Sequence, residues 1–211
     1  MLLHTKQTIC AVVVLLLSIL LSSNSICAEW TPDRIASLKA LASQGHAGAQ
    51  STLGILYMKG KGVEQDYHKA REWFEKSAAQ GEGSAQIHLG CMYANGQGVR
   101  QSYHKACELF EKAAGQEDDL GTQAEAQFLL GALYEEGAGV PKNLTTARKL
   151  YEKSASQGNT RAQATLGVYY EHGYGGVERN LAIAKEWYGK ACDNGFQAGC
   201  DEYRRLNTGE K

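Results

Sequence analysis

The sequence predicts an all-α solenoid of stacked helix pairs, and three observations support this prediction: a repeat, a helical spacing and a recurring turn. A block of roughly 36 residues occurs four times, and each copy has the same few fixed residues. Self-similarity at such a period is typical of solenoids, in which each unit packs only against its neighbours. The copies begin at Ala49, Ala85, Ala126 and Ala162.

Each copy opens with the spacing of an amphipathic helix. In the first copy Ala49, Leu53 and Tyr57 stand four residues apart, so they share one face of a helix. A glycine follows the leucine in every copy, although glycine in mid-helix costs about 1 kcal/mol relative to alanine. Its recurrence predicts that a second helix approaches closely there. The four mid-helix glycines are Gly54, Gly90, Gly131 and Gly167.

A glycine-rich turn and a second helix follow in each copy. The G-x-G-V motif, as in residues 60–63, can end a helix in the left-handed conformation and reverse the chain. Three residues later stands a side chain that is favoured at helix N-caps, namely Asp66, Ser102, Asn143 or Asn180. We expect a small residue of the second helix to face the mid-helix glycine. These small residues are Ala70, Ala106, Ala147 and Ala184.

The two ends of the array are half-repeats. Thr31-Pro32 is an N-cap followed by a first-turn proline, and residues 33–44 match a second helix. Residues 197–207 resemble a first helix without its partner, and such atypical units cap solenoids. An acidic insertion at 116–123 is expected to form a solvated loop. We therefore predict one domain, 29–211, with a half-repeat at 31–45, repeats at about 46–81, 82–118, 123–158 and 159–195, and a capping half-repeat at 196–207.

The N-terminus has the composition of an export signal. Lys6 precedes an apolar core from residue 9 to residue 21, and small and polar residues follow up to Ala28. Thirteen helical residues span about 20 Å, which is less than the roughly 30 Å of a bilayer's hydrocarbon core. We therefore expect residues 1–28 to be a cleaved signal peptide, no membrane span after cleavage, and a periplasmic or secreted protein.

The charge balance argues against nucleic acid as a partner. The chain has 22 Lys and Arg against 23 Asp and Glu, and neither sign dominates a long run. Nucleic-acid-binding domains usually carry a clear basic excess. We therefore expect no nucleic acid as a partner.

These fixed residues, from the Ala–Leu–Gly–Tyr spacing to the G-x-G-V turn, closely resemble the Sel-one-like repeat (SLR) family, a relative of the tetratricopeptide repeat. The resemblance covers about residues 45–206. It implies a right-handed α/α superhelix of antiparallel helix pairs that acts as a protein-binding scaffold or adaptor. With its export signal, the chain is similar to exported bacterial SLR proteins.

The resemblance also bears on the cysteines. Cys192 and Cys200 form an A-C-x7-C pattern similar to that of the cysteine-rich Hcp branch of SLR proteins, which implies a disulfide between successive helices. A second disulfide, between Cys91 and Cys107, remains open. An oxidising compartment favours pairing of all four exported cysteines, but the expected helix geometry turns these two side chains to the same side without making them face each other.

Two motifs suggest chemistry, and both have structural explanations. His88 and His104 each stand three residues before a cysteine, but the helix periodicity places them on opposite outer sides, so we expect no metal site. Ser102 and Lys105 match the S-x-x-K motif of serine β-lactamases, yet Ser102 occupies the N-cap slot of its copy. We therefore expect no catalytic residue and no cofactor. The alternative is an Hcp-like penicillin- or peptidoglycan-binding protein, or a weak β-lactamase.

A partner segment is expected in the concave groove lined by the first helices, by analogy with tetratricopeptide arrays. The groove would change from apolar to acidic along the array, which suits a segment with apolar and then basic groups. The candidate groove residues are Ile55, Met58, Lys59, Ile87 and Asn95 in the early copies, and Phe128, Glu135, Glu136, Glu171 and His172 in the later ones.

Overall fold

The computed structural model describes residues 30–116 and 119–209, so the predicted signal peptide lies outside the described residues. Within these two ranges the chain forms ten α-helices, one short 3-10 helix and no strand. No helix among the described residues is both long and apolar enough to cross a bilayer. The helices are α2 (Pro32–Ser43), α3 (Ala47–Lys59), α4 (Tyr67–Ala79), α5 (Gly83–Asn95), α6 (Tyr103–Ala114), α7 (Leu120–Glu136), α8 (Leu144–Ser156), α9 (Thr160–His172), η1 (Tyr174–Gly176), α10 (Leu181–Asp193) and α11 (Gln197–Thr208).

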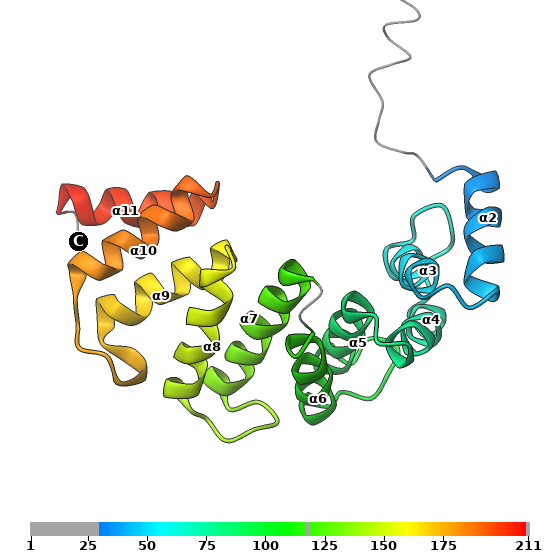
Figure 1. The fold of residues 1–211 in the computed structure, drawn as a ribbon, viewed down its shortest axis with the longest axis horizontal. Helices are drawn as coiled ribbons and strands as arrows, with labels where there is room; N and C mark the ends of the chain where they lie inside the picture. The colour runs from blue at the N-terminus through cyan, green and yellow to red at the C-terminus, as the bar shows by residue number, and fades with distance from the viewer. Residues whose placement is uncertain (1–29, 117–118, 210–211) are drawn as a thin grey trace, which may run out of the picture.

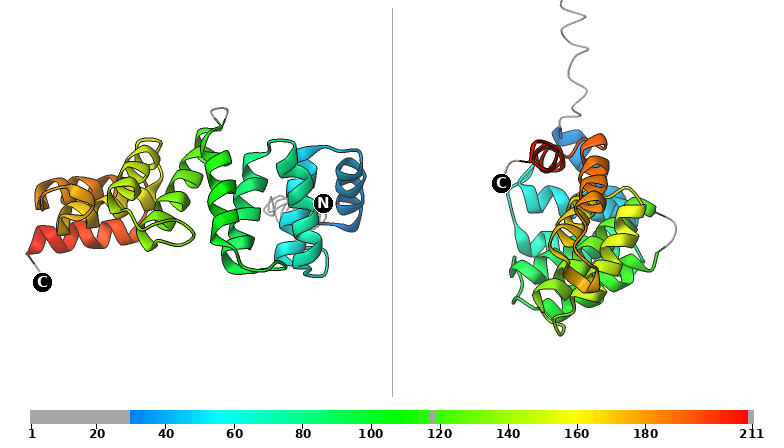
Figure 2. Two further views of the ribbon diagram at one scale, coloured as in Figure 1. Left: turned by 90° about the horizontal axis from the view of Figure 1, so that it is seen from below. Right: turned by 90° about the vertical axis from the view of Figure 1, so that its left-hand side faces the viewer.

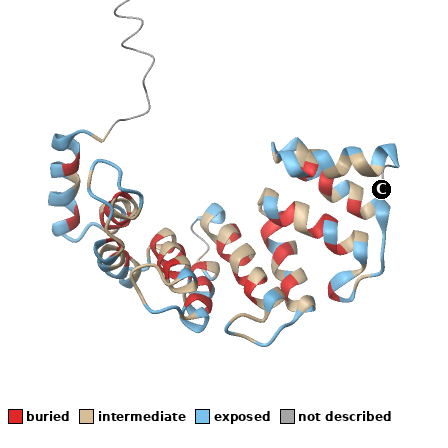
Figure 3. Ribbon diagram, turned by 180° about the vertical axis from the view of Figure 1, so that it is seen from behind, coloured by how far each residue is buried: buried red, intermediate tan, exposed pale blue. Residues whose placement is uncertain are grey.

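Consecutive helices pack against one another along the whole array, which confirms the predicted all-α solenoid. The pairs stack into an arch whose end helices, α2 and α11, rise on the same side (Figure 1). Successive pairs are also rotated relative to each other, as the two further views show (Figure 2). Buried residues follow the helix–helix interfaces, whereas α2 and α11 keep broad exposed faces (Figure 3). The core is therefore a continuous row of small interfaces.

The predicted caps set the helix boundaries. Asp66 and Asn143 each accept a hydrogen bond at 3.0 Å from the backbone N–H three residues later, and Ser102 does the same at 3.4 Å. Asn180 caps α10 in the same way. The first helices end at Gly60, Gly96, Gly137 and Gly173, all of which have left-handed backbone angles that disfavour other residues.

The mid-helix glycines do mark a close approach, but the group that faces them is an aromatic ring. A Cβ added to Gly131 would lie 2.7 Å from Cε1 of Tyr151, and one added to Gly54 would lie 2.7 Å from Cε1 of Phe74. The prediction that an alanine faces each glycine was therefore wrong. The aromatic side chains are long enough to extend across the helix pair and cover the place where the glycine has no side chain, whereas the alanines are buried elsewhere in the pair. The rings are those of Phe74, Phe110, Tyr151 and Tyr188.

In three of the four repeats a buried glutamine links the unit to the one before it. Gln50 donates from Nε2 to the carbonyl of Ala42 at 3.0 Å, eight residues earlier and across the turn between units. Its own Oε1 accepts from Gln80 at 2.7 Å, at the end of the second helix of the same repeat. Gln86 and Gln163 repeat both contacts. These side chains are only 4–5% exposed, so their polar groups depend on these partners.

Part of the acidic insertion is helical, although we predicted a loop. We expected a solvated loop over 116–123, but α7 begins at Leu120 and is 17 residues long. Asp119 supplies the N-cap, since its carboxylate accepts from the N–H groups of Gly121 and Thr122 at 2.9 and 3.2 Å. Part of the insertion therefore lengthens α7, the first helix of the third repeat, by a turn.

The last junction replaces the glutamine with a covalent bond. Cys200 stands four residues after the N-cap of α11, as Gln163 does in α9, and it is joined to Cys192 eight residues earlier with a Cα–Cα distance of 4.4 Å. The disulfide implied by the resemblance is thus present, in the position where the other junctions use a hydrogen bond. It fastens a terminal helix that has no partner helix of its own among the described residues.

The close approach at the mid-helix glycine predicts opposite effects for two glycine-to-alanine changes. Gly131→Ala should lower the free energy of unfolding by about 1–3 kcal/mol, because the added methyl group overlaps the ring of Tyr151. Gly48→Ala is the matched control, since its Cβ would meet nothing within 4 Å and alanine favours the helix by up to about 1 kcal/mol. Urea denaturation measures both. A Gly131→Ala protein as stable as the Gly48→Ala control would contradict this account of the pair.

The disulfide predicts a local loss of stability. In Cys192→Ala/Cys200→Ala, α11 should open more often, because closing so short a loop stabilises by roughly 2–3 kcal/mol in the chain-entropy model. Cys192→Ala/Cys200→Gln should recover about 1 kcal/mol by restoring the hydrogen bond seen at the other junctions. Amide hydrogen exchange in α11 measures both effects. Equal protection of α11 in the native protein and both variants would show that the bond does not hold this helix.

Candidate functional site

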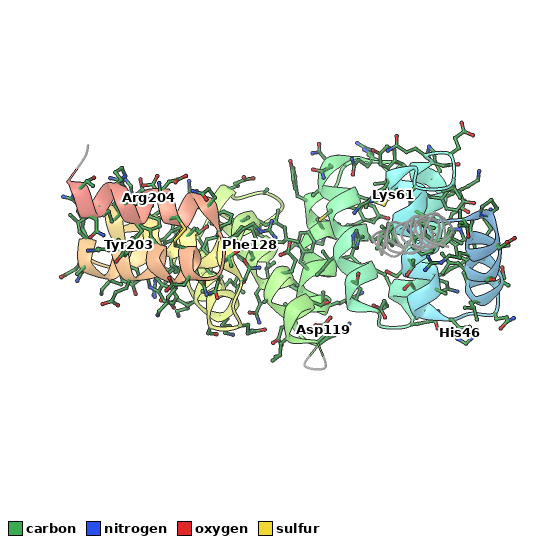
Figure 4. All side chains as sticks on the ribbon, turned by 90° about the horizontal axis from the view of Figure 1, so that it is seen from above. His46, Lys61, Asp119, Phe128, Tyr203 and Arg204 are labelled. Carbon is green, nitrogen blue, oxygen red and sulfur yellow. A yellow bond between two sulfur atoms is a disulfide. The ribbon has the colours of Figure 1, made fainter. Side chains whose placement is uncertain are left out.

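The inner side of the arch is the candidate site. There α3, α5 and α7 lie above their partner helices α4, α6 and α8 (Figure 1). The view from above looks onto this side and shows Phe128 near the middle of the array, with Tyr203 and Arg204 on α11 at one end (Figure 4). In this part of the array the first helices therefore face the inner side of the arch.

Four of the predicted groove residues form one exposed series. Each occupies the last position of its first helix before the closing glycine. All four side chains are solvent-exposed, and the series contains a base, an amide, an acid and an imidazole in chain order. The members are Lys59, Asn95, Glu136 and His172.

The apolar candidates are less accessible than predicted. Ile55, Met58 and Phe128 are half-buried, and each packs against a core cluster. Ile87 is only 9% exposed and belongs to the core between the second and third repeats, so the expectation that it faces the groove is corrected. The next unit covers it, because its position on the helix turns toward that unit.

Two of the acidic candidates accept hydrogen bonds from buried tyrosines of their own repeats. The hydroxyl of Tyr151 donates to Glu135 at 2.6 Å, and that of Tyr188 donates to Glu171 at 3.0 Å. Burial raises the pKa of both tyrosines, and the neighbouring carboxylates raise it further. These glutamates thus satisfy phenol groups that would otherwise be buried without a partner.

The sequence contains a signal for these contacts, which we did not predict from it. In the first two repeats the ring that covers the glycine is Phe74 or Phe110, and the residue at the glutamate position is Met58 or Ala94. In the last two repeats the ring is a tyrosine and the residue is a glutamate. The two positions change together, because a hydroxyl at the end of the ring needs an acceptor there.

Glu171 is further engaged by the terminal helix. Arg205 of α11 donates from Nη2 to Oε1 of Glu171 at 2.6 Å. Burial would raise the pKa of Glu171, but the hydrogen bonds from Arg205 and Tyr188 outweigh it and hold this pKa below its ordinary value. The side chain is 12% exposed. The expectation that Glu171 lines an open groove is therefore corrected, since α11 covers it.

Cys91 and Cys107 are not joined in the structure, so the second disulfide that we left open is absent there. Burial raises the pKa of the Cys107 thiol to about 11, and Glu111 on the same helix adds to the shift. Burial, followed by the charge of Glu125 on α7, raises the pKa of Cys91. The two thiols thus have different charged neighbours, and both are protonated at neutral pH, which makes them weak nucleophiles.

A small hollow lies between the second and third units, and an ion pair joins the third unit to the fourth. A cavity of about 190 Å³ separates α5 from α7 and is lined by Ile87, His88 and Glu125, among others. Glu125 pairs with Arg161 of α9, whose guanidinium lies 4.5 Å from the ring centroid of Phe128. The pair links two neighbouring first helices, and Arg161 covers part of the ring of Phe128.

The residues with a possible chemical role lie in separate places. Ser102 Oγ is occupied as a helix cap, and Lys105 Nζ lies 4.9 Å from the ring centroid of Tyr93. His88 stacks on Phe74 with ring centroids 5.1 Å apart, whereas His104 contacts Glu108 at 3.4 Å. Across the described residues, no cluster of three or more His, Cys, Asp or Glu side chains could hold a metal ion.

The chain matches a family model over most of its length. The model of the Sel1 repeat matches residues 47–82, 83–118, 124–159 and 160–196. Proteins with these repeats are generally non-catalytic scaffolds that mediate protein–protein interactions. No curated protein sequence matches the chain at a significant level.

Solved structures agree with this match. A protective antigen of uropathogenic Escherichia coli that displays an SLR fold is 36% identical, with a TM-score of 0.72 over 80% of this chain and 35% of that chain. A Sel1 repeat protein from Oxalobacter formigenes is 33% identical, with a TM-score of 0.66 over 81% of this chain and 62% of that one. The chain thus spans less than two thirds of either protein. With four matched repeats and this fold, the chain belongs to the Sel1-repeat family.

Proposed function

We propose that this protein is an exported, non-catalytic scaffold that binds a short segment of another protein along the inner side of its first helices. The observation that carries the proposal is the exposed series Lys59, Asn95, Glu136 and His172, which runs along four successive units. The fixed residues of each repeat are used for packing and turning, and this series varies freely between copies. Variation at exposed positions on a rigid array is how solenoids discriminate between partners.

Export is part of the proposal and rests on two features. Residues 1–28 have the order of a cleaved signal peptide, with Lys6 ahead of a short apolar core. Cys192 and Cys200 form a disulfide, and structural disulfides persist mainly in oxidising compartments. Both features suit a bacterial periplasmic or secreted protein.

The chemistry of the inner side suits a segment with apolar and basic groups. Ile55, Ala132 and Val168 contribute apolar surface, and Glu136 is an exposed acid in the third unit. With only four full units the contact area is limited, so we expect a short segment or a modest affinity.

Site-specific photocrosslinking tests where the partner binds. A benzophenone amino acid at Asn95 or Glu136 should yield adducts with another protein in the bacterial envelope, because both residues are exposed at the ends of first helices. The matched controls are Glu72 and Lys112, which are also exposed but lie on the second helices. Mass spectrometry identifies the adducts. Adducts of equal yield from both sets would contradict the assignment of the inner side.

The enzyme alternative gives a separate prediction. The purified protein should neither hydrolyse nitrocefin above background nor retain labelled penicillin on a denaturing gel, because the hydroxyl of Ser102 caps α6 and Lys105 is directed to Tyr93. Ser102→Ala should behave identically in both assays. Turnover that disappears in Ser102→Ala would overturn the non-catalytic proposal and favour an Hcp-like penicillin-binding protein.

A further inference from the structure

At the last junction of the array, a glutamate of α9 forms an ion pair with an arginine of α11. Glu171 stands two residues before the glycine that ends α9, and Arg205 stands nine residues after the N-cap of α11. Their side chains form an ion pair at 2.6 Å, and Glu202 holds the same guanidinium at 2.6 Å. A largely buried acid is thus neutralised by an arginine of the neighbouring helix.

The preceding junction has the same acid without the base. Glu135 stands two residues before the glycine that ends α7, and the residue nine positions after the N-cap of α9 is Val168. Valine cannot donate a hydrogen bond or carry a charge. No ion pair of Glu135 occurs in residues 30–116 and 119–209. Within the same ranges, this carboxylate accepts one hydrogen bond of good geometry, from the hydroxyl of Tyr151 at 2.6 Å.

A second polar group at this junction lies beside the same carboxylate. Tyr169 is fully buried, and its hydroxyl makes no hydrogen bond of good geometry to any described residue. Burial, then the charge of Glu135 and a weak hydrogen bond with it, raise the pKa of Tyr169, so the hydroxyl lies close to this carboxylate. A buried hydroxyl without a well-formed hydrogen bond is costly and uncommon in native proteins. The acid and the phenol therefore leave hydrogen-bonding capacity unused at one place.

The place is open to solvent. Val168 is 38% exposed, and Glu136, beside Glu135 in the chain, is exposed as well. Glu135 itself is only half-buried. A side chain of a bound segment can thus reach Glu135 over Val168, which occupies the position that Arg205 has at the next junction.

We propose that Glu135 is the recognition site for an arginine side chain of the bound segment, which completes at the third junction the acid–guanidinium pair that Glu171 and Arg205 form within the chain at the fourth. This inference rests on the proposed function, because it assumes a protein segment on the inner side. It adds the chemical identity of one side chain of that segment and the place where it binds.

Arginine fits this place better than lysine does. A guanidinium has five N–H donors in a planar fork, so it can bind the Glu135 carboxylate and still donate to the oxygen of Tyr169. It is also less strongly hydrated than an ammonium group, which lowers the cost of moving it to a half-buried site. Charge-assisted bonds of this kind are stronger than neutral ones.

A peptide selection tests the inference directly. Random peptides displayed on phage are selected against the purified protein, and the bound peptides are remade with a fluorophore for affinity measurement. We expect an arginine at one fixed place in the selected peptides. Its replacement by citrulline, which has a similar shape without the charge, should weaken binding at least tenfold.

Two variants and one control locate the effect. Glu135→Gln keeps an acceptor for Tyr151 but removes the charge, so it should lose the same tenfold, and citrulline should then make no further difference. Val168→Arg should block the site from within the chain and weaken the same peptides. Glu72→Gln, which removes an exposed acid from a second helix, is the control and should retain the affinity. Thermal unfolding of each variant verifies that the fold is kept.

The other outcomes separate the two proposals. Peptides that bind the wild type and Glu135→Gln equally well, with no arginine preference, would overturn the arginine site and leave the scaffold proposal standing. A selection that yields no binding peptide at all would contradict both, because the inner side would then not bind peptide segments.

Discussion

The contact between a mid-helix glycine and an aromatic ring is the constraint on which the rest of this array depends. At Gly54, Gly90, Gly131 and Gly167 the ring of the partner helix lies so close that a single methyl group would overlap it. The contact brings the two helices of a pair together and fixes where the far end of each ring lies. Where that ring is a tyrosine, its hydroxyl must find an acceptor, and the first helix supplies a glutamate. The charge on the inner side of the last two repeats is thus tied to the packing of each pair.

Contacts between units use a second recurring group, the buried glutamine after the opening alanine. It bridges the carbonyl of the previous unit and an amide of its own unit, as Gln50 does between Ala42 and Gln80. Three junctions resemble one another because each buried amide has the same two partners, whereas in the third repeat Gln123 makes the contact to the previous unit. The last junction differs, since α11 has no second helix of its own within the described chain. There the glutamine is replaced by Cys200 and its disulfide, and Arg205 adds an ion pair to Glu171.

The proposed partner surface consists of exposed residues that these packing contacts do not use. The fixed residues are buried or form caps and turns, so they are the same in every copy and carry no information about a partner. Lys59, Asn95, Glu136 and His172 are exposed and differ from copy to copy. Glu135 lies between the two classes, because it serves Tyr151 and still lacks the base that Glu171 has. A half-buried acid on an open face is a natural contact point for a cationic group of a partner.

The sequence by itself determined the repeat, the helix pairs and the caps, because these depend on local spacing and on residues such as Asp66 and Gly60 that act within a few positions. It also indicated which first-helix positions vary between copies. Only the tertiary structure decided which of them are available. Ile87 and Glu171 look equivalent to exposed residues along the chain, but the next unit covers one and α11 covers the other. Contacts between different helices likewise decided which side chain covers each mid-helix glycine. They also decided that Cys91 and Cys107 do not pair and that, among the described residues, Glu135 has no base beside it. Burial depends on what the neighbouring unit places against a side chain, and the spacing within one helix does not contain that information.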